Sequence, residues 1–308
     1  MKKERFLRNL LPPAGPVDVV LDTDTYNEVD DQFAIAYLVR SSHRLTVKGF
    51  CAAPFFNAIV SSPAEGMEKS YGEIFHILSL AGREDLHEKI YKGSNRYLPD
   101  EQTPVESDAA RFLADLSGSY SQERPLYIIA IGAITNVASA LLMDPAMAER
   151  VVIVWLGGHA HHWTDTHEFN MMQDIAAARV VFDSGAPLVQ LPCRGVVDRF
   201  STTHWELEHW LGGKNPLCDY LISHTVDYAR RRLDPNGPWS KPLWDVTAIG
   251  WLLNENNRFM EQEIRPCPVP EYDDHYSFDT DRYPMAYVRG INRDALFADL
   301  FAALTSSV

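Results

Sequence analysis

The sequence predicts an α/β protein with an open, mostly parallel sheet that is doubly wound, Rossmann-like, flanked by helices, and followed by a helical C-terminal part. Short continuous apolar runs alternate with longer segments of helical periodicity between residues 17 and 191. Continuous apolar strands indicate a sheet that is buried on both faces, as parallel sheets are. Because the sequence contains neither a Ser/Gly-rich linker nor an internal repeat, we expect a single domain over residues 1–308, with residues 1–16 as an N-terminal extension.

The same patterns place the individual elements along the chain. Strands are expected at residues 17–21, 45–51, 126–131, 151–156 and 187–191. Helices are expected at residues 30–40, 63–81, 134–143, 174–182, 205–211, 217–232, 244–254 and 294–304. Three consecutive arginines, Arg230 to Arg232, favour a helix end there, because cations stabilise a helix C-terminus. The following Asp-Pro-Asn-Gly-Pro at 234–238 predicts a turn.

Composition narrows the class of protein. The chain is 46% hydrophobic and 23% charged, which indicates a folded core, and its net charge of −14 disfavours binding to nucleic acid or to an anionic membrane. The N-terminus lacks the apolar core of a signal peptide, and no window approaches 18 apolar residues. The four cysteines are widely spaced without a C-x-x-C pattern, so we expect reduced thiols and a cytoplasmic location.

The segment that follows the first expected strand is densely acidic. Asp22, Asp24, Glu28, Asp30 and Asp31 lie within ten residues, and few basic residues are nearby. Carboxylates this close repel one another, so a divalent cation is the expected compensating charge. For Asp30 and Asp31 the alternative is ordinary stabilisation of a helix N-terminus. That alternative does not explain the two acids at the end of the strand, so the metal interpretation is favoured.

Other segments could complete such a site, because the carboxyl ends of parallel strands meet at one edge of the sheet. Asp245 opens an apolar helix, although it could be a simple N-cap. A polar loop after the expected strand at 151–156 carries His159, His161 and His162, followed by His167, Glu168 and Asn170. The three histidines lack the i, i+4 spacing and the H-E-x-x-H pattern of zinc sites. We therefore favour substrate contacts over zinc for this loop.

Five motifs in this order resemble the nucleoside hydrolases, the inosine–uridine-preferring N-ribohydrolases. The resemblance covers about residues 17–255, with weaker similarity at 286–304. The motifs are Asp22-x-Asp24 with Asp30-Asp31, Asn57 after the second strand, Gly132-Ala-Ile-Thr-Asn136, Gly157-Gly158 with Glu168-Phe-Asn170 and Asp174, and the Asp245-led helix.

The resemblance implies calcium-dependent hydrolysis of the N-glycosidic bond of a ribonucleoside or related N-riboside, through an oxocarbenium-like transition state, to ribose and a free base. It implies that Asp24 accepts the proton of the attacking water, and that Asp22 supports the loop. It also implies a homodimer or homotetramer. The implied metal ligands are Asp24, Asp31, the backbone carbonyl of Ile131, and Asp245. The implied substrate-binding residues are Asp30, Asn57, His162, Glu168, Asn170 and Trp244.

Three departures make this chain an atypical relative. The stretch between Asp24 and Asp30 is two residues longer than the family pattern, so Asn27 and Glu28 either approach the site or face solvent. Trp244 stands where the family often places a histidine that protonates the leaving base, and tryptophan cannot donate a proton to a leaving base, although it can stack on one. His162 stands in place of a ribose-binding asparagine. Replacement acids could come from His159, His161, His162 or His275.

Two other functions remain open at this point. A non-catalytic homologue that binds ribose and metal is compatible with the loss of the leaving-group acid. A phosphatase of the HAD type also begins with a strand and an Asp-x-Asp motif. Those phosphatases usually carry Thr or Val at the position of Tyr26 and need a later lysine and acidic pair, which the sequence does not reveal clearly.

Overall fold

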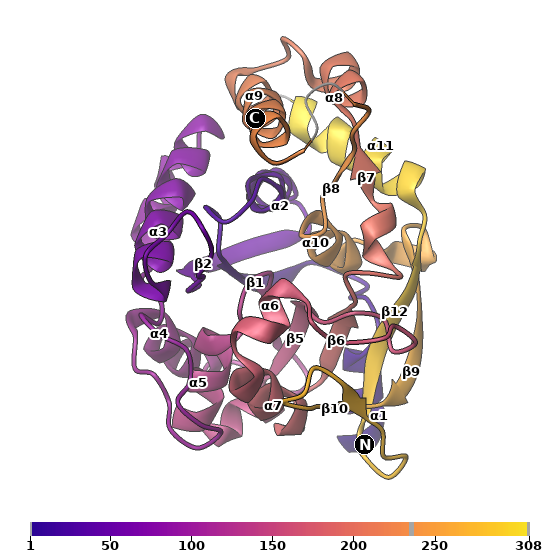
Figure 1. Ribbon diagram of the computed structural model, residues 1–308. Helices are drawn as coiled ribbons and strands as arrows, with labels where there is room; N and C mark the ends of the chain where they lie inside the picture. Colours follow the sequence, from indigo (N-terminus) through magenta and orange to yellow (C-terminus); the bar gives the residue numbers. More distant parts are fainter. Residues whose placement is uncertain (1, 234–236, 307–308) are drawn as a thin grey trace.

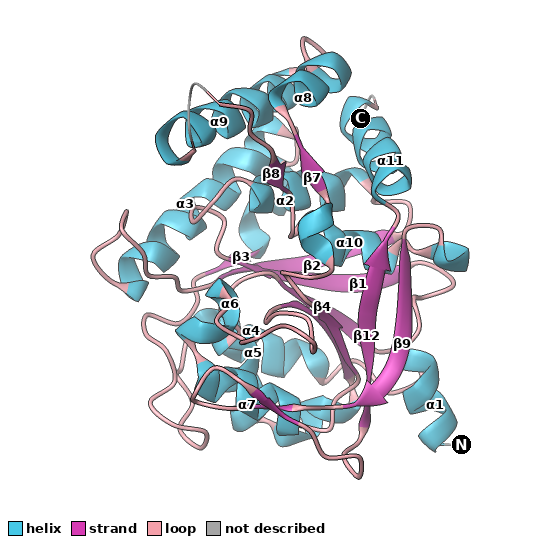
Figure 2. Ribbon diagram, turned by 45° about the vertical axis from the view of Figure 1, so that its right-hand side comes forward, coloured by secondary structure: helices cyan, strands magenta, loops and turns pink. Residues whose placement is uncertain are grey.

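The computed structural model describes residues 2–233 and 237–306 and contains a central eight-stranded sheet (Figures 1 and 2). All neighbouring strands pair in parallel except the last two, which are antiparallel. The predicted fold class is therefore confirmed. In spatial order the strands are β3 (Ile90–Tyr91), β2 (Leu45–Ala52), β1 (Val17–Thr23), β4 (Leu126–Ala130), β5 (Val151–Leu156), β6 (Leu188–Leu191), β12 (Pro284–Ile291) and β9 (Met260–Pro266).

Helices cover both faces of this sheet (Figure 1). One layer consists of α2 (Asp30–Arg40), α3 (Pro63–Leu80), α10 (Val246–Leu252) and α11 (Arg293–Thr305), with α8 (His204–Leu211) and α9 (Pro216–Arg232) packed outside it. The other layer consists of α4 (Asp108–Ser117), α5 (Thr135–Met143) and α7 (Ile175–Asp183). Val19 and Leu21 of β1 belong to the first apolar core and Val20 to the second. This alternation follows from the two-residue period of a strand.

Several elements were missed by the sequence patterns. They include α1 (Lys2–Asn9), α4, α6 (Phe169–Gln173), the edge strands β3, β9 and β12, and two small antiparallel pairs. The pairs are β7 (Ser201–Thr202) with β8 (Lys241–Pro242) and β10 (Val269–Pro270) with β11 (Tyr276–Ser277). Short 3₁₀ segments lie at Glu84–Lys89, Pro145–Glu149, Val197–Arg199 and Glu255–Asn257. Of the turn predicted at 234–238, residues 234–236 lie outside the described part of the chain.

The order of the strands fixes where a ligand site can form. From β1 the chain moves outward through β2 to β3, and it then returns to the other side of β1 to add β4, β5 and β6. The carboxyl ends of β1 and β4 therefore flank a topological switch point, where open α/β sheets hold their ligands. Asp24 follows β1 and Ile131 follows β4, so the expected edge of the sheet carries the acidic segment.

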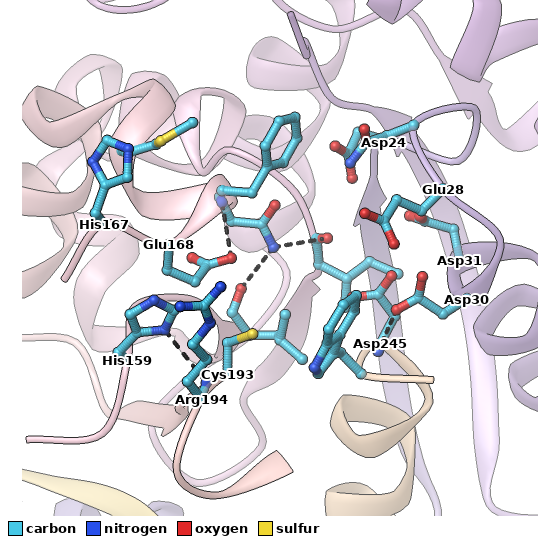
Figure 3. Close-up of a pocket in the computed structure, with 17 residues that line it drawn as sticks. Asp24, Glu28, Asp30, Asp31, His159, His167, Glu168, Cys193, Arg194 and Asp245 are labelled. Carbon is cyan, nitrogen blue, oxygen red and sulfur yellow. Dashed lines mark hydrogen bonds between the residues drawn. The ribbon is translucent and has the colours of Figure 1, made fainter. Parts of the chain in front are cut away.

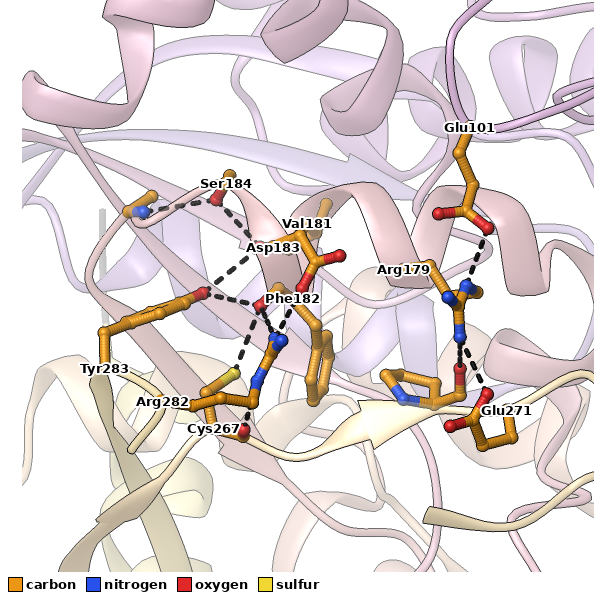
Figure 4. Close-up of polar contacts among 12 residues, drawn as sticks. Glu101, Arg179, Val181, Phe182, Asp183, Ser184, Cys267, Glu271, Arg282 and Tyr283 are labelled. Carbon is orange, nitrogen blue, oxygen red and sulfur yellow. Dashed lines mark hydrogen bonds and ion pairs between the residues drawn. The ribbon is translucent and has the colours of Figure 1, made fainter. Parts of the chain in front are cut away.

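Charged contacts anchor the β10–β11 hairpin and the start of β12 to α7 (Figure 4). Arg179 of α7 donates hydrogen bonds to Glu101 at 2.7 Å and to Glu271 of the hairpin at 2.9 Å. Arg282, just before β12, donates to Asp183 at the end of α7 at 2.6 Å. These contacts hold the hairpin and the start of β12 against α7. Among the described residues, no helix is long and apolar enough to cross a bilayer.

Candidate active site

A cavity of about 270 Å³ opens at the switch point. Figure 3 shows the carboxylates of Asp24, Glu28, Asp30, Asp31 and Asp245 on one side of it and His159, His167, Glu168 and Arg194 on the other. Eight of the ten predicted site residues line the cavity; Asn57 and His162 do not. Six of the lining residues are acids: Asp24, Glu28, Asp30, Asp31, Glu168 and Asp245.

Three of these acids form a compact cluster. Asp30, Asp31 and Asp245 are buried, and each contributes a carboxylate oxygen that lies within 4.8 Å of the others. Asp245 occupies the N-cap position of α10, yet its side chain makes no capping hydrogen bond. The N-cap of α2 is Val29, again without a side-chain bond. The capping interpretation therefore does not account for these carboxylates, which point into the cavity instead.

The electrostatics of the cluster call for a cation. Burial raises the pKa of Asp31 to about 7, and the charge of Asp30 adds to this effect. Burial, with repulsion from neighbouring carboxylates, also raises the pKa of Asp24 and Asp245 well above the usual range. Asp24 Oδ2 is buried without a hydrogen-bond partner among the described residues. An orphaned oxygen next to three clustered carboxylates matches the all-oxygen ligand set that hard divalent cations prefer. The residues present therefore fit a divalent cation.

Asp22 lies behind this cluster rather than in the cavity. Its Oδ1 accepts a hydrogen bond of 2.7 Å from Asn136 Nδ2, and the same amide donates to the carbonyl of Ala52 at 3.1 Å. Burial raises the pKa of Asp22 to about 7. Asn136 lies in the first turn of α5, shortly after Gly132, and its amide connects the ends of β1 and β2.

The opposite wall of the cavity presents Glu168 and Asn170. Glu168 caps α6 by accepting backbone N–H groups from Asn170 and Met171, and it accepts a third from Gly158 at 2.8 Å. Burial nevertheless raises the pKa of Glu168 to about 7. The Asn170 amide donates to the carbonyls of Ile131 at 3.2 Å and Leu156 at 3.0 Å. Its own oxygen is therefore the atom left to accept a ligand hydroxyl.

The longer loop after β1 brings two residues into the cavity wall. Asn27 and Glu28 both line the cavity, so of the two alternatives, approach to the site or exposure to solvent, the structure shows approach to the site. Asn57 donates a 2.7 Å hydrogen bond to the Asn27 side chain and does not itself line the cavity. Asn27 therefore stands between Asn57 and the ligand space, where the sequence analysis expected Asn57.

A buried lysine at this site was missed from the sequence. Lys241 Nζ lies 2.6 Å from Glu28 Oε2 and 3.2 Å from Asp30 Oδ1, and only 4% of its side chain is exposed. Burial lowers the pKa of Lys241, but the charges of Asp30 and Glu28 more than compensate, so its pKa is raised and it carries an ammonium. The same nitrogen lies 3.9 Å from the ring centroid of Trp244. The available signal was its position four residues before Asp245.

Some histidines of the loop after β5 line the cavity, and others lie outside it. Trp163 N–H donates to the Ala160 carbonyl at 2.7 Å, and this turn points His159 inward while His162 is exposed. His162 therefore does not line the cavity, and its expected contact with substrate stays a prediction. His161 packs against Tyr276 and Tyr287 instead, and His275 lies exposed, bonded to the Asp273 carbonyl.

His159 reaches the cavity as a neutral ring. Its Nδ1 accepts the backbone N–H of Arg194 at 3.3 Å, which leaves Nε2 to carry the proton. Burial lowers the pKa of His159 to about 4. His167 also lines the cavity, and its Nδ1 lies 2.9 Å from Asp274 of the hairpin. His159 is therefore a hydrogen-bond donor at neutral pH and does not replace a cationic acid.

Trp244 contributes an aromatic side chain to the cavity wall. It lines the cavity, and its Nε1 is buried without a hydrogen-bond partner among the described residues. Lys241 covers part of the ring, so the cavity side remains for a ligand. This arrangement supports contact with a flat group, by stacking or through the indole N–H.

The fold and this cavity define a doubly wound α/β protein with an acidic cation site facing a polar wall, suited to a hydroxylated ligand. Residues 19–292 match the model of the inosine-uridine preferring nucleoside hydrolases, and the chain belongs to this family. The family resemblance is thereby confirmed. Nucleoside hydrolases are N-glycosyl hydrolases.

Relatives of known type support the same family. The pyrimidine-specific ribonucleoside hydrolase RihB of Escherichia coli O1:K1 / APEC is 30% identical over 132 residues, which are 41% of this chain and 41% of that protein. The chain spans about half the length of the curated relatives it matches.

Solved structures extend the similarity to nearly the whole chain. The plant nucleoside hydrolase PpNRh1 is 20% identical with a TM-score of 0.73, covering 95% of this chain and 100% of that one. A purine-preferring ribonucleoside hydrolase from Gardnerella vaginalis is 19% identical with a TM-score of 0.73, covering 94% and 98%. At these identities the likeness establishes the fold.

Proposed function

We propose that this protein hydrolyses the N-glycosidic bond of a ribonucleoside or a related N-riboside. The observation that carries the proposal is the meeting of Asp30, Asp31 and Asp245, within 4.8 Å, with Asp24 in one cavity that also presents Glu168 and Asn170. A cation site on one wall and hydrogen-bonding groups on the other can hold a ribose by its hydroxyls. Family membership supports the same reaction.

In this proposal calcium is the resident cation, held by Asp24, Asp31, Asp245 and the carbonyl of Ile131. When bound, such a cation keeps the buried carboxyl groups ionised and makes a nearby water more acidic. Asp24 accepts the proton of the attacking water, and Asp30 accepts a hydrogen bond from a ribose hydroxyl. Glu168 and Asn170 hold the far side of the sugar. The dense carboxylates stabilise positive charge that develops on the sugar ring as the bond breaks.

We infer that the leaving group departs without a proton from Trp244 or His159. Trp244 carries no transferable proton of suitable pKa, and His159 is neutral at pH 7. We therefore propose that the natural substrate releases a base of low basicity, or one protonated before departure. Relatives with pyrimidine-specific and purine-preferring names leave the base itself open. A cytoplasmic location, expected from the widely spaced cysteines, and a homodimer or homotetramer, expected from the resemblance alone, remain part of the proposal.

The test is release of reducing sugar from a panel of nucleosides and from p-nitrophenyl riboside, with calcium and with a chelator. Asp24→Asn is expected to lower kcat by roughly 10²–10⁴-fold, the usual contribution of a positioned base. Asp115→Asn, an exposed acid on α4, serves as the matched control and should leave turnover unchanged. Full activity of Asp24→Asn would contradict the assignment.

Trp244 also favours a second candidate, a non-catalytic protein that binds ribose and metal. Calorimetric binding of both ligands, without turnover of even the nitrophenyl riboside, would favour this candidate over hydrolysis. Because nitrophenolate leaves without an acid, its riboside separates loss of a leaving-group acid from loss of the whole reaction.

A further inference from the structure

Lys241 is the buried cation next to the acidic cluster, and its surroundings define what it can do. It enters from β8, which pairs with β7 at Thr202, and its Nζ also donates to the Pro242 carbonyl at 2.9 Å. The side chain lies behind Asp30 and does not line the cavity. A group in this place does not contact a sugar, so it acts through the carboxylates that it holds.

Lys241 bonds two acids of different kinds. Asp30 belongs to the cluster with Asp31 and Asp245, whereas Glu28 comes from the longer stretch between Asp24 and Asp30. Both side chains approach the same ammonium, at 3.2 Å and 2.6 Å. The two longer-loop residues thus each have a partner from another element, Asn27 with Asn57 and Glu28 with Lys241.

The two oxygens of Asp30 are used differently. Oδ1 faces the ammonium of Lys241, and Oδ2 accepts the backbone N–H of Asp245 at a long 3.4 Å. An ammonium next to Asp30 repels a second cation and partly neutralises the carboxylate, so Asp30 becomes the weakest metal ligand of the cluster. The long bond at Oδ2 leaves that oxygen the freer one, turned toward the other acids of the cavity.

We propose that Lys241 is a positioning residue that assigns the carboxylates, reserving Asp30 for a ligand hydroxyl and leaving Asp31, Asp245 and Asp24 to the cation. Glu28 is its counter-charge, which keeps the ammonium in place without drawing it toward the metal ligands. The longer loop thus supplies Glu28, the acidic partner in an ion pair that determines which carboxylates bind the cation and which binds the ligand hydroxyl. The inference rests on the proposed function for the identity of the hydroxylated ligand, ribose.

Substitutions of Lys241 and of Glu28 should change Ca²⁺ affinity in opposite directions. Lys241→Met removes a positive charge and frees Asp30, so affinity for Ca²⁺ should rise by about tenfold or more. Glu28→Gln leaves the ammonium unbalanced, so Ca²⁺ affinity should fall by a similar factor of about ten. The double variant should return near the wild-type value, because both charges are gone. Ribose binding should fall in Lys241→Met and in the double variant, since Asp30 has lost its anchor.

Calcium affinity is measured by calorimetry on the full chain without sugar, and ribose affinity at saturating Ca²⁺. Lys241→Arg, which keeps the charge, checks the inference if Lys241→Met fails to fold, and it should stay within threefold of wild type for Ca²⁺. Lys92→Met, which breaks the exposed pair with Glu68 at 2.7 Å, is the control for loss of a lysine ion pair. Melting temperatures identify any general loss of structure.

Ca²⁺ affinities that fall in both single variants, or that stay at the wild-type value in both, would overturn the inference. If the wild-type protein binds Ca²⁺ but neither binds ribose nor turns over any riboside, the proposed function fails. The opposite signs of the two calcium shifts would then still decide whether Lys241 controls the metal site.

Discussion

At the residue scale, Trp244 determines which contacts the cavity offers to a flat ligand group. Its ring faces the cavity while its Nε1 lies buried without a partner among the described residues. Two contacts with a leaving base are therefore available, the ring face and the N–H. Substitutions of Trp244 distinguish the two contacts, because phenylalanine keeps an aromatic ring face but lacks the N–H donor.

If the ring face makes the contact, Trp244→Ala should raise KM for nucleosides about 5–160-fold, because stacking of a base on an aromatic side chain contributes about 1–3 kcal/mol. Trp244→Phe should raise KM by less than threefold. Steady-state kinetics with uridine and inosine provide the measurement. Equal losses in the two variants would instead assign the contact to the indole N–H.

Residues also mark the limit of what the sequence could reveal. Asp24, Asp30 and Asp31 were identified because a strand and a helix place them close together within one stretch of chain. Lys241 bonds Asp30 across 211 positions, and a single lysine before an apolar helix carries no periodicity or spacing that indicates burial. His162 was predicted as a site residue from its spacing to Glu168 in the sequence. The turn between Ala160 and Trp163 breaks that correspondence, and His159 faces inward instead.

At the element scale, α3 connects the sheet to the loop after β1. Ser70 of this helix accepts the backbone N–H of Tyr26 at 3.3 Å, next to the acids that line the cavity. Gly66 lies where the helix passes the end of the β2 loop, and a Cβ there would be 2.1 Å from the Phe55 carbonyl oxygen. Gly72 lies in the same helix with open space around it.

These two glycines should respond in opposite ways to alanine. Gly72→Ala should stabilise the protein by about 0.5–1 kcal/mol, because alanine loses less backbone entropy in a helix. Gly66→Ala should destabilise it by more than that gain, since the helix must move away from the Phe55 carbonyl. Urea unfolding of both variants gives the comparison. A stabilising Gly66→Ala would mean that the close approach is easily relaxed.

Strands that are buried along their whole length could be predicted from the sequence, whereas strands with mixed burial could not. The fully buried strands β4 and β5 appear as continuous apolar runs and were located within one residue of their observed bounds. The edge strand β9 alternates buried with exposed and charged residues, and it pairs only with β12, so its sequence carries no comparable signal. Two-residue strands such as β7 and β8 depend on a partner far along the chain.

At the scale of the whole molecule, the buried carboxyl groups of the site make stability depend on pH. Glu168 is fully buried, and its pKa is raised from 4.5 to about 7. The folded state therefore keeps a proton that the unfolded chain has already released, so the stability that this protonated carboxyl contributes is fully present below pH 4.5 and is lost as pH rises through 7. Asp22 and Asp31, raised to about 7 by burial, act in the same direction.

In the presence of a chelator, the free energy of unfolding should therefore decrease between pH 4.5 and 7.5. Glu168 alone should account for a decrease on the order of 3 kcal/mol, from 1.36 kcal/mol per pKa unit. Denaturant titrations at several pH values measure the slope, which should be shallower in Glu168→Gln. Glu88→Gln, an exposed substitution, should keep the wild-type slope.

Added Ca²⁺ should reverse much of this loss at pH 7.5 and little of it at pH 5, because a cation binds the deprotonated carboxylates. A slope that stays the same in Glu168→Gln would show that this carboxyl titrates normally in the folded protein. The overall charge of −14 adds self-repulsion at high pH in every variant alike, so the differences between variants isolate the site.

The separation of Lys241 and Asp245 from the acids of β1 and α2 also has a consequence for synthesis on the ribosome. Asp30 is made 211 positions before Lys241, which at about 5–20 residues per second corresponds to a delay of roughly 10–40 s. During that interval the nascent N-terminal half holds Asp24, Glu28, Asp30 and Asp31 without the ammonium and the fourth aspartate that complete the cluster. The contacts of α10 with α2 therefore cannot form until residues 246–252 have been made, long after the first strands.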